Sequence, residues 1–256
     1  MPILSDRNLF VTDAGEGDPV VMLHGLGGTS SMYQPQAAAL VETNRVVRID
    51  LAGSGRSPHD GPLSIESWAD DIVSVLGALG IDHAVFVAHS LGTLVAVDIA
   101  RRYPSLVTSL VALGPVRAQP SKVKEATRAR AQTVRQLGME SIVDGVLSVA
   151  LSDAARRDKP VVAAFIRESL LAQPPLGYSA SCEALAAVED PRWTAVAVPT
   201  WLVNGTDDKL AAPQLVDAIQ ADVPHASRVE VPGAGHWLSV EEPELVTDIV
   251  RKALSA

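Results

Sequence analysis

The sequence predicts an α/β fold with a mostly parallel, doubly wound sheet of eight strands that carries helices on both faces. Short apolar runs alternate with amphipathic helical patterns along the chain, which is typical of parallel strands joined by crossover helices. Most of these runs are continuously apolar, as strands covered on both faces must be. A third observation is that residues 117–193 contain helical patterns but no convincing strand, which predicts a helical cap inserted between strands.

Each element is expected for a local reason. Six apolar runs are expected to form the parallel strands: 20–23, 46–49, 84–87, 109–113, 200–203 and 228–231. Segments 2–4 and 8–12 are expected to add antiparallel edge strands. A helix is predicted from Ile65 to Leu79 by apolar residues at helical spacing, with Ser64 as its N-cap. Further helices are predicted over 91–103, which Pro104 ends, and over 214–221 and 243–254. We therefore expect a core formed by 1–116 and 194–256, and a cap formed by 117–193.

Composition excludes several classes of function. The chain has 256 residues and a formal net charge of −9, and no dense block of Lys and Arg stands out, which argues against a nucleic-acid-binding groove. No segment is long and apolar enough to span a bilayer, and the N-terminus does not resemble a signal peptide. The single cysteine, Cys182, excludes an intrachain disulfide. A cytoplasmic protein with no membrane partner is expected.

Ser90 lies where a predicted strand runs directly into a predicted helix. The surrounding sequence is Ala88-His89-Ser90-Leu91-Gly92, which matches the nucleophile pattern Gly-x-Ser-x-Gly except for alanine in the first place. A sharp turn here would expose the hydroxyl at the carboxyl edge of the sheet, where ligands bind in such folds. The alternative is that Ser90 only caps the helix that begins at Leu91.

A serine nucleophile needs a base, and His236 is the best of six candidates. It lies in a glycine-rich loop after the last predicted strand, at the same edge as Ser90. His24 belongs to a glycine-rich loop, and His89 is expected to point away from Ser90. The remaining three are expected to face solvent: His59, His83 and His225.

The imidazole needs a carboxylate to fix its tautomer, and Asp208 is expected to supply it. It follows the strand predicted over 200–203, and Asp207 is the alternative. The backbone N–H groups of Leu26 and Leu91 are expected to form an oxyanion hole. Leu91 begins a helix, and Leu26 lies in the glycine-rich loop that follows the strand over 20–23. That loop lacks the glycine patterns of phosphate-binding loops.

Together these motifs resemble those of the α/β-hydrolases over the whole chain. The resemblance rests on the loop at His24-Gly25, the glycine-rich turn at 50–57, the elbow at 88–92, the acid loop at 205–208 and Gly235-His236. It implies an α/β-hydrolase fold and a Ser90–His236–Asp208 triad that forms an acyl-enzyme, with no metal or organic cofactor. The turn at 50–57 is interpreted as structural.

Residues 177–185, with the sequence GYSASCEAL, resemble a cap segment of 3-oxoadipate enol-lactonases. This resemblance implies a small-molecule ester or lactone substrate, with an anionic enol-lactone such as 3-oxoadipate enol-lactone as one candidate. Four arginines between residues 117 and 135 could bind the anion: Arg117, Arg128, Arg130 and Arg135. A solvated helix face explains the same arginines equally well. A C–C bond hydrolase, a cofactor-free perhydrolase and a catalytically silent binding protein remain alternatives.

Overall fold

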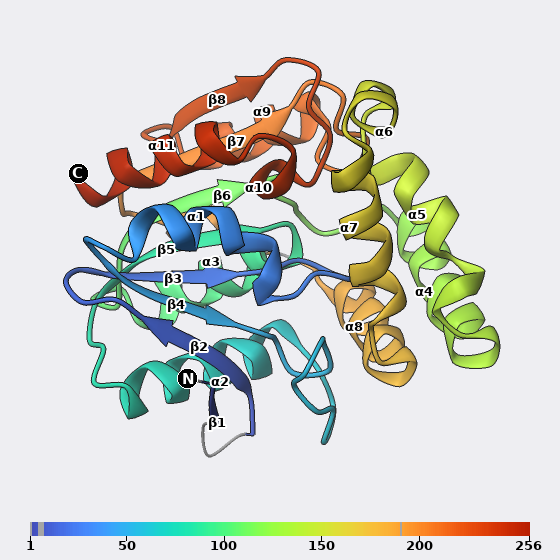
Figure 1. The fold of residues 1–256 in the computed structure, drawn as a ribbon, viewed down its shortest axis with the longest axis horizontal. Helices are drawn as coiled ribbons and strands as arrows, with labels where there is room; N and C mark the ends of the chain where they lie inside the picture. Colours follow the sequence, from blue (N-terminus) through green and yellow to red (C-terminus); the bar gives the residue numbers. More distant parts are fainter. Residues whose placement is uncertain (1, 5–7, 190) are drawn as a thin grey trace.

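The sheet has eight strands, in the order β1-β2-β4-β3-β5-β6-β7-β8. The computed structural model describes residues 2–4, 8–189 and 191–256 (Figure 1). β1 and β2 run antiparallel to their neighbours, and the other six strands are parallel. The mostly parallel sheet is thus confirmed. Its strands are β1 Pro2–Leu4, β2 Phe10–Ala14, β3 Pro19–Leu23, β4 Arg45–Ile49, β5 Ala84–His89, β6 Val107–Leu113, β7 Thr200–Gly205 and β8 Ser227–Val231.

Helices cover both faces of the sheet, and each face has its own hydrophobic core. Side chains alternate between the faces along each strand, so Val21 belongs to one core and Met22 to the other. One face packs against α2 Ile65–Ala78, α3 Leu91–Arg102 and α9 Pro213–Asp222. The other packs against α1 Gln34–Leu40 and α11 Pro243–Leu254.

Helix ends follow the local chemistry of the sequence. The Ser64 hydroxyl accepts a hydrogen bond from the Ser67 N–H and caps α2 as predicted, and the Ser67 hydroxyl completes a capping box.

Three short helices were not predicted: α1, α10 Leu238–Glu241 and the 3-10 helix η1 Ser30–Tyr33. They have between four and seven residues, which is too short for a clear apolar repeat.

Five helices, which we call the cap helices, lie between β6 and β7. Figure 1 shows them gathered at the end of the sheet to which the parallel strands point. They are α4 Ser121–Leu137, α5 Val143–Ala150, α6 Asp153–Asp158, α7 Pro160–Leu171 and α8 Pro175–Ala187, with the 3-10 helices η2 Met139–Ser141 and η3 Trp193–Ala195. The division into a core and a cap at residues 117 and 193 stays a prediction.

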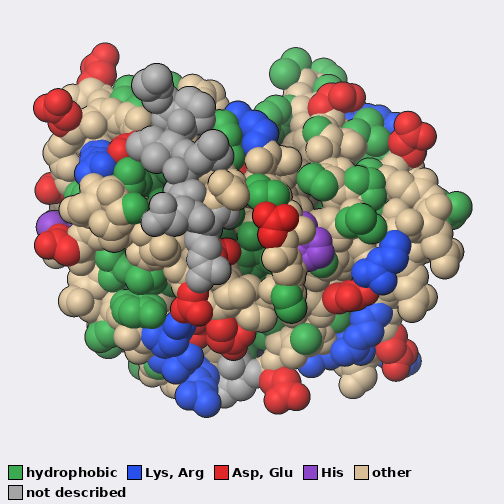
Figure 2. Space-filling model, turned by 90° about the horizontal axis from the view of Figure 1, so that it is seen from below, with side chains coloured by type: hydrophobic (Ala, Val, Ile, Leu, Met, Phe, Trp, Pro, Cys, Tyr) green, Lys and Arg blue, Asp and Glu red, His purple; other side chains and the backbone are tan. Residues whose placement is uncertain are grey.

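The surface mixes charges of both signs. Figure 2 shows acidic and basic side chains close together on the face it presents, although the net charge is −9. In the part of the chain that the structure describes, every helix is too short or too polar to cross a membrane.

Candidate active site

Ser90 occupies the sharp turn between β5 and α3 that the sequence predicted. Its backbone angles are φ 50° and ψ −117°, a conformation that residues other than glycine rarely adopt. The structure describes all of residues 84–100, and within them only Ser90 is not buried. Its side chain makes no capping hydrogen bond to α3. The turn therefore leaves Ser90 partly exposed and does not use its hydroxyl as a helix cap.

The turn is possible because its neighbours are small. A Cβ atom at Gly92 would lie 2.6 Å from the His24 carbonyl oxygen and 2.7 Å from the Leu23 carbonyl oxygen. Only glycine fits that approach between α3 and β3. Ala88 is fully buried, and the turn is formed with its methyl group in place. The alanine in the first position of the motif is therefore compatible with the elbow.

The strained turn predicts that a side chain at position 90 lowers the stability of the fold. We expect Ser90→Gly to be more stable than Ser90→Ala by about 1 kcal/mol, because glycine releases a backbone strain of about 1–3 kcal/mol and loses part of this gain to the entropy of its unfolded chain. Denaturant unfolding of the two variants measures the difference. Equal stabilities would show that the turn is unstrained.

The side chains of His236 and Asp208 form a buried pair at the same rim. His236 lies in the loop after β8, and Asp208 in the loop after β7. The His236 Nδ1–H donates to Asp208 Oδ2 at 2.7 Å, and the two residues are 3% and 2% exposed. Asp208 Oδ1 accepts the backbone N–H groups of Leu210 and Ala211 at 2.8 and 2.7 Å. The bond between His236 Nδ1 and Asp208 Oδ2 orients the ring, so that in the neutral imidazole the lone pair lies on Nε2.

The carboxylate of Asp208 is ionised in this environment. Burial alone would raise the pKa of Asp208, but the imidazole of His236 and the hydrogen bonds that the carboxylate accepts lower it below its ordinary value. Asp207, the alternative from the sequence, is exposed, and its carboxylate accepts the Thr206 hydroxyl at 3.3 Å. Of the two aspartates, Asp208 is the one that contacts the histidine.

The loop that follows β3 packs directly against Ser90. Gly28 N–H donates to the Gly25 carbonyl at 3.0 Å and closes a tight turn. A Cβ atom at Gly25 would lie 2.8 Å from the Ser90 Cβ atom. In the described part of the chain no hydrogen bond engages the N–H of Leu26 or of Leu91. The N–H of Leu26, in the loop after β3, and the N–H of Leu91, at the start of α3, are thus free, and their role as an oxyanion hole stays a prediction.

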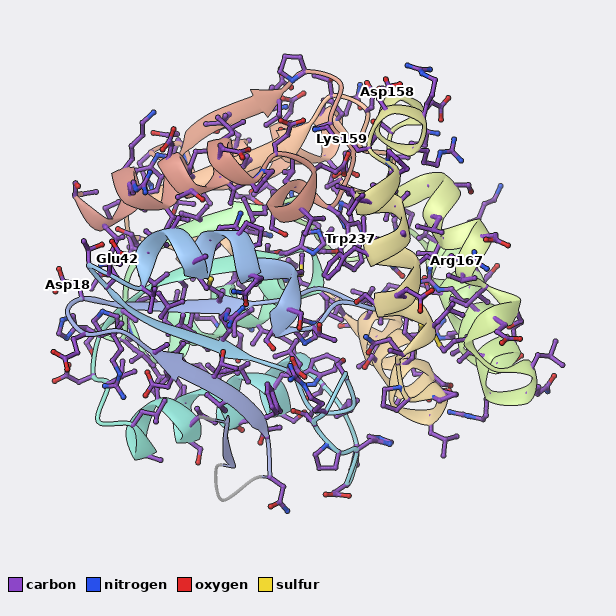
Figure 3. The ribbon with its side chains drawn as sticks, in the orientation of Figure 1. Asp18, Glu42, Asp158, Lys159, Arg167 and Trp237 are labelled. Carbon is purple, nitrogen blue, oxygen red and sulfur yellow. The ribbon has the colours of Figure 1, made fainter. Side chains whose placement is uncertain are left out.

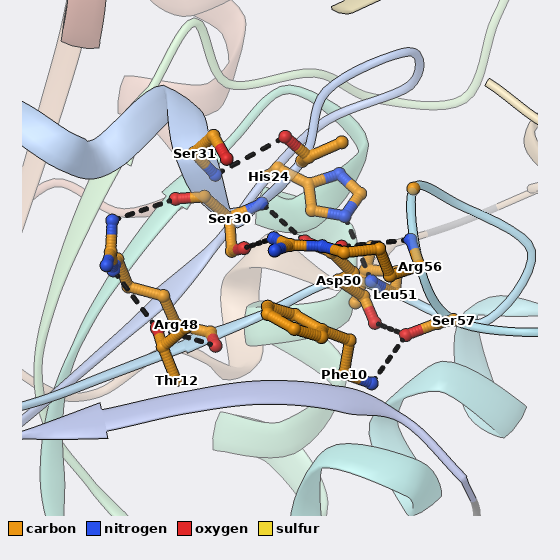
Figure 4. A network of polar contacts seen from close by, with 12 residues as sticks. Phe10, Thr12, His24, Ser30, Ser31, Arg48, Asp50, Leu51, Arg56 and Ser57 are labelled. Carbon is orange, nitrogen blue, oxygen red and sulfur yellow. Dashed lines mark hydrogen bonds and ion pairs between the residues drawn. The ribbon is translucent and has the colours of Figure 1, made fainter. Parts of the chain in front are cut away.

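A second buried polar network holds that loop in place (Figure 4). His24 Nδ1–H donates to the Gly25 carbonyl, and its Nε2 accepts the Leu51 N–H at 2.9 Å. Asp50 accepts the Ser30 N–H at 2.7 Å and pairs with Arg56. Burial lowers the pKa of His24, so the ring stays neutral. The network joins the loop after β3 to the turn at 50–57, which supports a structural role for that turn.

The contacts that His89 makes at this site were not predicted. Its side chain was expected to point away from Ser90, and its ring centre lies 4.7 Å from that of His236. His89 Nε2–H donates to the His236 carbonyl oxygen at 2.8 Å. The bond joins residues 147 positions apart in sequence, so no local pattern could reveal it. His59, His83 and His225 are exposed, as expected.

Protonation of His89 couples folding to pH. Burial and the nearby His236 lower the pKa of His89 to about 3. An unfolded histidine takes up a proton below about pH 6.5, so the stability from neutral His89 is complete above that pH and is lost as pH falls toward 3. We expect the free energy of unfolding to fall by about 2 kcal/mol between pH 6.5 and 5 because of His89.

Denaturant unfolding at pH 7 and pH 5 measures this loss. The difference between the two pH values should be smaller in His89→Gln, which keeps a donor for the His236 carbonyl, than in wild type. His59→Gln, at an exposed site, is the control and should leave the difference unchanged. Equal pH dependence in all three proteins would contradict a buried neutral His89.

The fold matches that of the α/β-hydrolases. The family model described as the alpha/beta hydrolase fold matches residues 18–243, and the chain belongs to that family. This confirms the fold and the family resemblance drawn from the motifs.

Several relatives span nearly the whole chain. An esterase from Thermogutta terrifontis, solved with malate bound, has a TM-score of 0.92 and 28% identity, with 100% of this chain and 97% of the esterase covered. The enol-lactonase from Burkholderia xenovorans LB400 has a TM-score of 0.89 and 29% identity, with 97% and 96% covered. A putative carbamate hydrolase from Azorhizobium caulinodans is 25% identical over 96% of this chain and 94% of its own length. The family and these relatives identify the chain as a hydrolase.

Proposed function

We propose that the protein hydrolyses carboxylic esters or lactones through an acyl-enzyme on Ser90. The observations that carry this proposal are the strained turn at Ser90, which follows β5, and the hydrogen-bonded pair of His236 and Asp208, whose loops follow β8 and β7 at the same edge of the parallel sheet. A hydroxyl in such a turn, with a neutral imidazole held by a carboxylate, is the arrangement that acyl transfer needs. The relatives named as an esterase and an enol-lactonase support the same bond class.

The proposed reaction assigns a role to each of these residues. His236 Nε2 takes the proton of the Ser90 hydroxyl as the oxygen attacks the substrate carbonyl, and Asp208 holds the imidazole and stabilises the imidazolium that forms. The N–H groups of Leu26 and Leu91 donate to the developing oxyanion. His236 then protonates the leaving alcohol, and water, deprotonated by His236, releases the acid and restores Ser90. No hydrogen bond joins Ser90 Oγ to His236 in the described chain, and such bonds often shorten only when substrate binds.

An assay of wild type against aryl esters, lactones and vinylogous diketones tests the bond class. We expect turnover of esters or lactones. Turnover of the diketones alone would indicate C–C bond hydrolysis, and peroxyacid formation from a carboxylic acid and hydrogen peroxide would indicate a perhydrolase. Absence of turnover and of labelling by a fluorophosphonate would indicate a catalytically silent binding protein.

Arg130 on α4 favours an anionic substrate. Of the four arginines considered above, Arg117 and Arg135 pair with carboxylates and Arg128 donates to a carbonyl. Arg130 lies against Cys182 with its Cζ 6.0 Å from the centre of the Tyr178 ring, and no carboxylate among the described residues pairs with it. Its buried Nε has no hydrogen-bond acceptor. A partly buried cation without an anion is costly, and a substrate carboxylate could offset that cost.

We expect Arg130→Met to lower kcat/KM for a carboxylate-bearing lactone by about 10–100-fold, because a charge-assisted hydrogen bond contributes about 1.5–3 kcal/mol. Turnover of a neutral ester of similar size should be unchanged. Arg135→Met, which removes an exposed arginine paired with Glu183, is the control. Equal losses on both substrates would exclude recognition of the anion by Arg130.

A further inference from the structure

The backbone on both sides of His236 is held by side chains outside the proposed triad. Gly235 N–H donates to Glu241 Oε2 and Trp237 N–H donates to Glu241 Oε1, each at 2.9 Å. One carboxylate thus spans the histidine and binds the residue before it and the residue after it. Figure 3 places Trp237 where this loop meets the cap helix α7.

Glu241 is buried and has no cation beside its carboxylate. It is 2% exposed, at the end of α10. Lys159 donates to the Glu241 backbone carbonyl but pairs through its charge with the carboxylate of Glu242, at 2.6 Å. Among the described residues no Lys or Arg forms an ion pair with Glu241. A buried carboxylate whose partners are two backbone amides lowers the stability of the fold. We therefore expect its charge or its geometry to serve the site.

We propose that Glu241 is a positioning residue for His236, which holds the imidazole in line with Ser90 and favours its protonated form during the reaction. The proposal rests on the function proposed above. It differs from the role of Asp208, because Asp208 contacts the ring at Nδ1, whereas Glu241 contacts only the backbone at both sides of it. Two further bonds complete the support: His236 N–H donates to the Ala150 carbonyl of the cap, and its carbonyl accepts from His89.

The charge of Glu241 acts on His236 through space. Burial raises the pKa of Glu241, and the two amides and the nearby His236 oppose that rise. The other titratable or charged groups around the pair are Asp208, His89, Lys159 and Glu242. Of these, His89 stays neutral and Lys159 is matched by Glu242, so Asp208 and Glu241 are the negative charges that face the imidazolium.

Glu241→Gln, with Glu242→Gln as the matched control, tests the proposal. Glutamine has the same shape but can accept from only one of the two amides and carries no charge. We expect Glu241→Gln to lower kcat by about 10–100-fold with KM changed less than about threefold, because a small misplacement of a catalytic group acts on the reacting geometry. The acid limb of kcat should move to lower pH, because the imidazolium loses a nearby negative charge.

The control and an NMR titration separate positioning from general damage. Glu242→Gln should keep kcat within about twofold of wild type and leave the acid limb in place, since the Glu242 carboxylate pairs with Lys159 and, among the described residues, does not bind the backbone beside His236. The titration midpoint of the His236 ring should fall in Glu241→Gln and not in Glu242→Gln. Equal losses in the two variants, a change in KM alone, or an unmoved midpoint would overturn the proposal.

Two further measurements apply if Glu241→Gln does not fold or if wild type has no turnover. If Glu241→Gln does not fold, the wild type carries the test: the amide resonances of Gly235 and Trp237 should titrate together with the Glu241 carboxyl carbon, and independent titration would contradict the proposal. If wild type lacks turnover and fluorophosphonate labelling, the proposed function fails, whereas the NMR comparison still decides whether Glu241 controls His236.

Discussion

Replacement of Ser90 by alanine is expected to lower kcat/KM by at least about 10⁴-fold on any ester or lactone that the wild type hydrolyses. Alanine removes the attacking oxygen and leaves the turn, the imidazole and both backbone donors in place. The remaining donors can still bind and polarise the carbonyl, so a residual rate above that of water is expected. Steady-state kinetics measure kcat/KM of the two proteins, and circular dichroism of the same samples checks that both are folded.

Ser181→Ala is the matched control for this substitution. Ser181 lies on α8, is 2% exposed, and its hydroxyl has no hydrogen-bond partner in the described structure. Its loss should leave kcat/KM within about twofold, because removal of an unpaired buried hydroxyl disturbs no network. Retention of most activity in Ser90→Ala would assign the reaction to another nucleophile or to direct attack by water.

Asp208→Asn is expected to lower kcat by about 10³–10⁴-fold while the protein stays folded. Asp208 Oδ1 accepts two backbone N–H groups, so the asparagine oxygen should remain there and its NH₂ group should take the place of Oδ2. That NH₂ group would donate to His236 Nδ1 and move the ring proton to Nε2. The imidazole would then have no lone pair facing Ser90.

Asp207→Asn separates this effect from a general loss of charge in the same loop. Its carboxylate is exposed and does not contact His236, so kcat should stay within about twofold of wild type. Steady-state kinetics on the two single variants make the comparison. A larger loss in Asp207→Asn than in Asp208→Asn would reverse the assignment of the acid.

Local sequence patterns predicted most of the elements because their causes are local. Helix α11 begins at Pro243 and ends at Leu254, as its pattern predicts, and Ser64 caps α2 through neighbours three residues away. Each parallel strand was found from its own apolar run, although the runs are shorter than the strands in the structure. Helix α1, with its run of three alanines, carries too little pattern to be recognised.

The supporting contacts of the site could not be predicted in the same way. Ser90, His236 and Asp208 each follow a strand, and the carboxyl ends of parallel strands meet at one edge, so topology predicts that they lie at the same edge of the sheet. His89 contacts His236 only after β5 and the loop after β8 come together. Glu241 lies five residues beyond His236, where the sequence shows an acid before a helix and gives no sign of burial. Contacts of this kind depend on tertiary packing.

The identity of the nucleophile is tested most directly by the site of a fluorophosphonate adduct, located by mass spectrometry of the digested protein. We expect one adduct per chain, on the peptide that contains Ser90, and none in Ser90→Ala. We expect slower labelling in Asp208→Asn and in Glu241→Gln, where the serine is present but its base is impaired. An adduct on another residue, or labelling of Ser90→Ala at the wild-type rate, would contradict it.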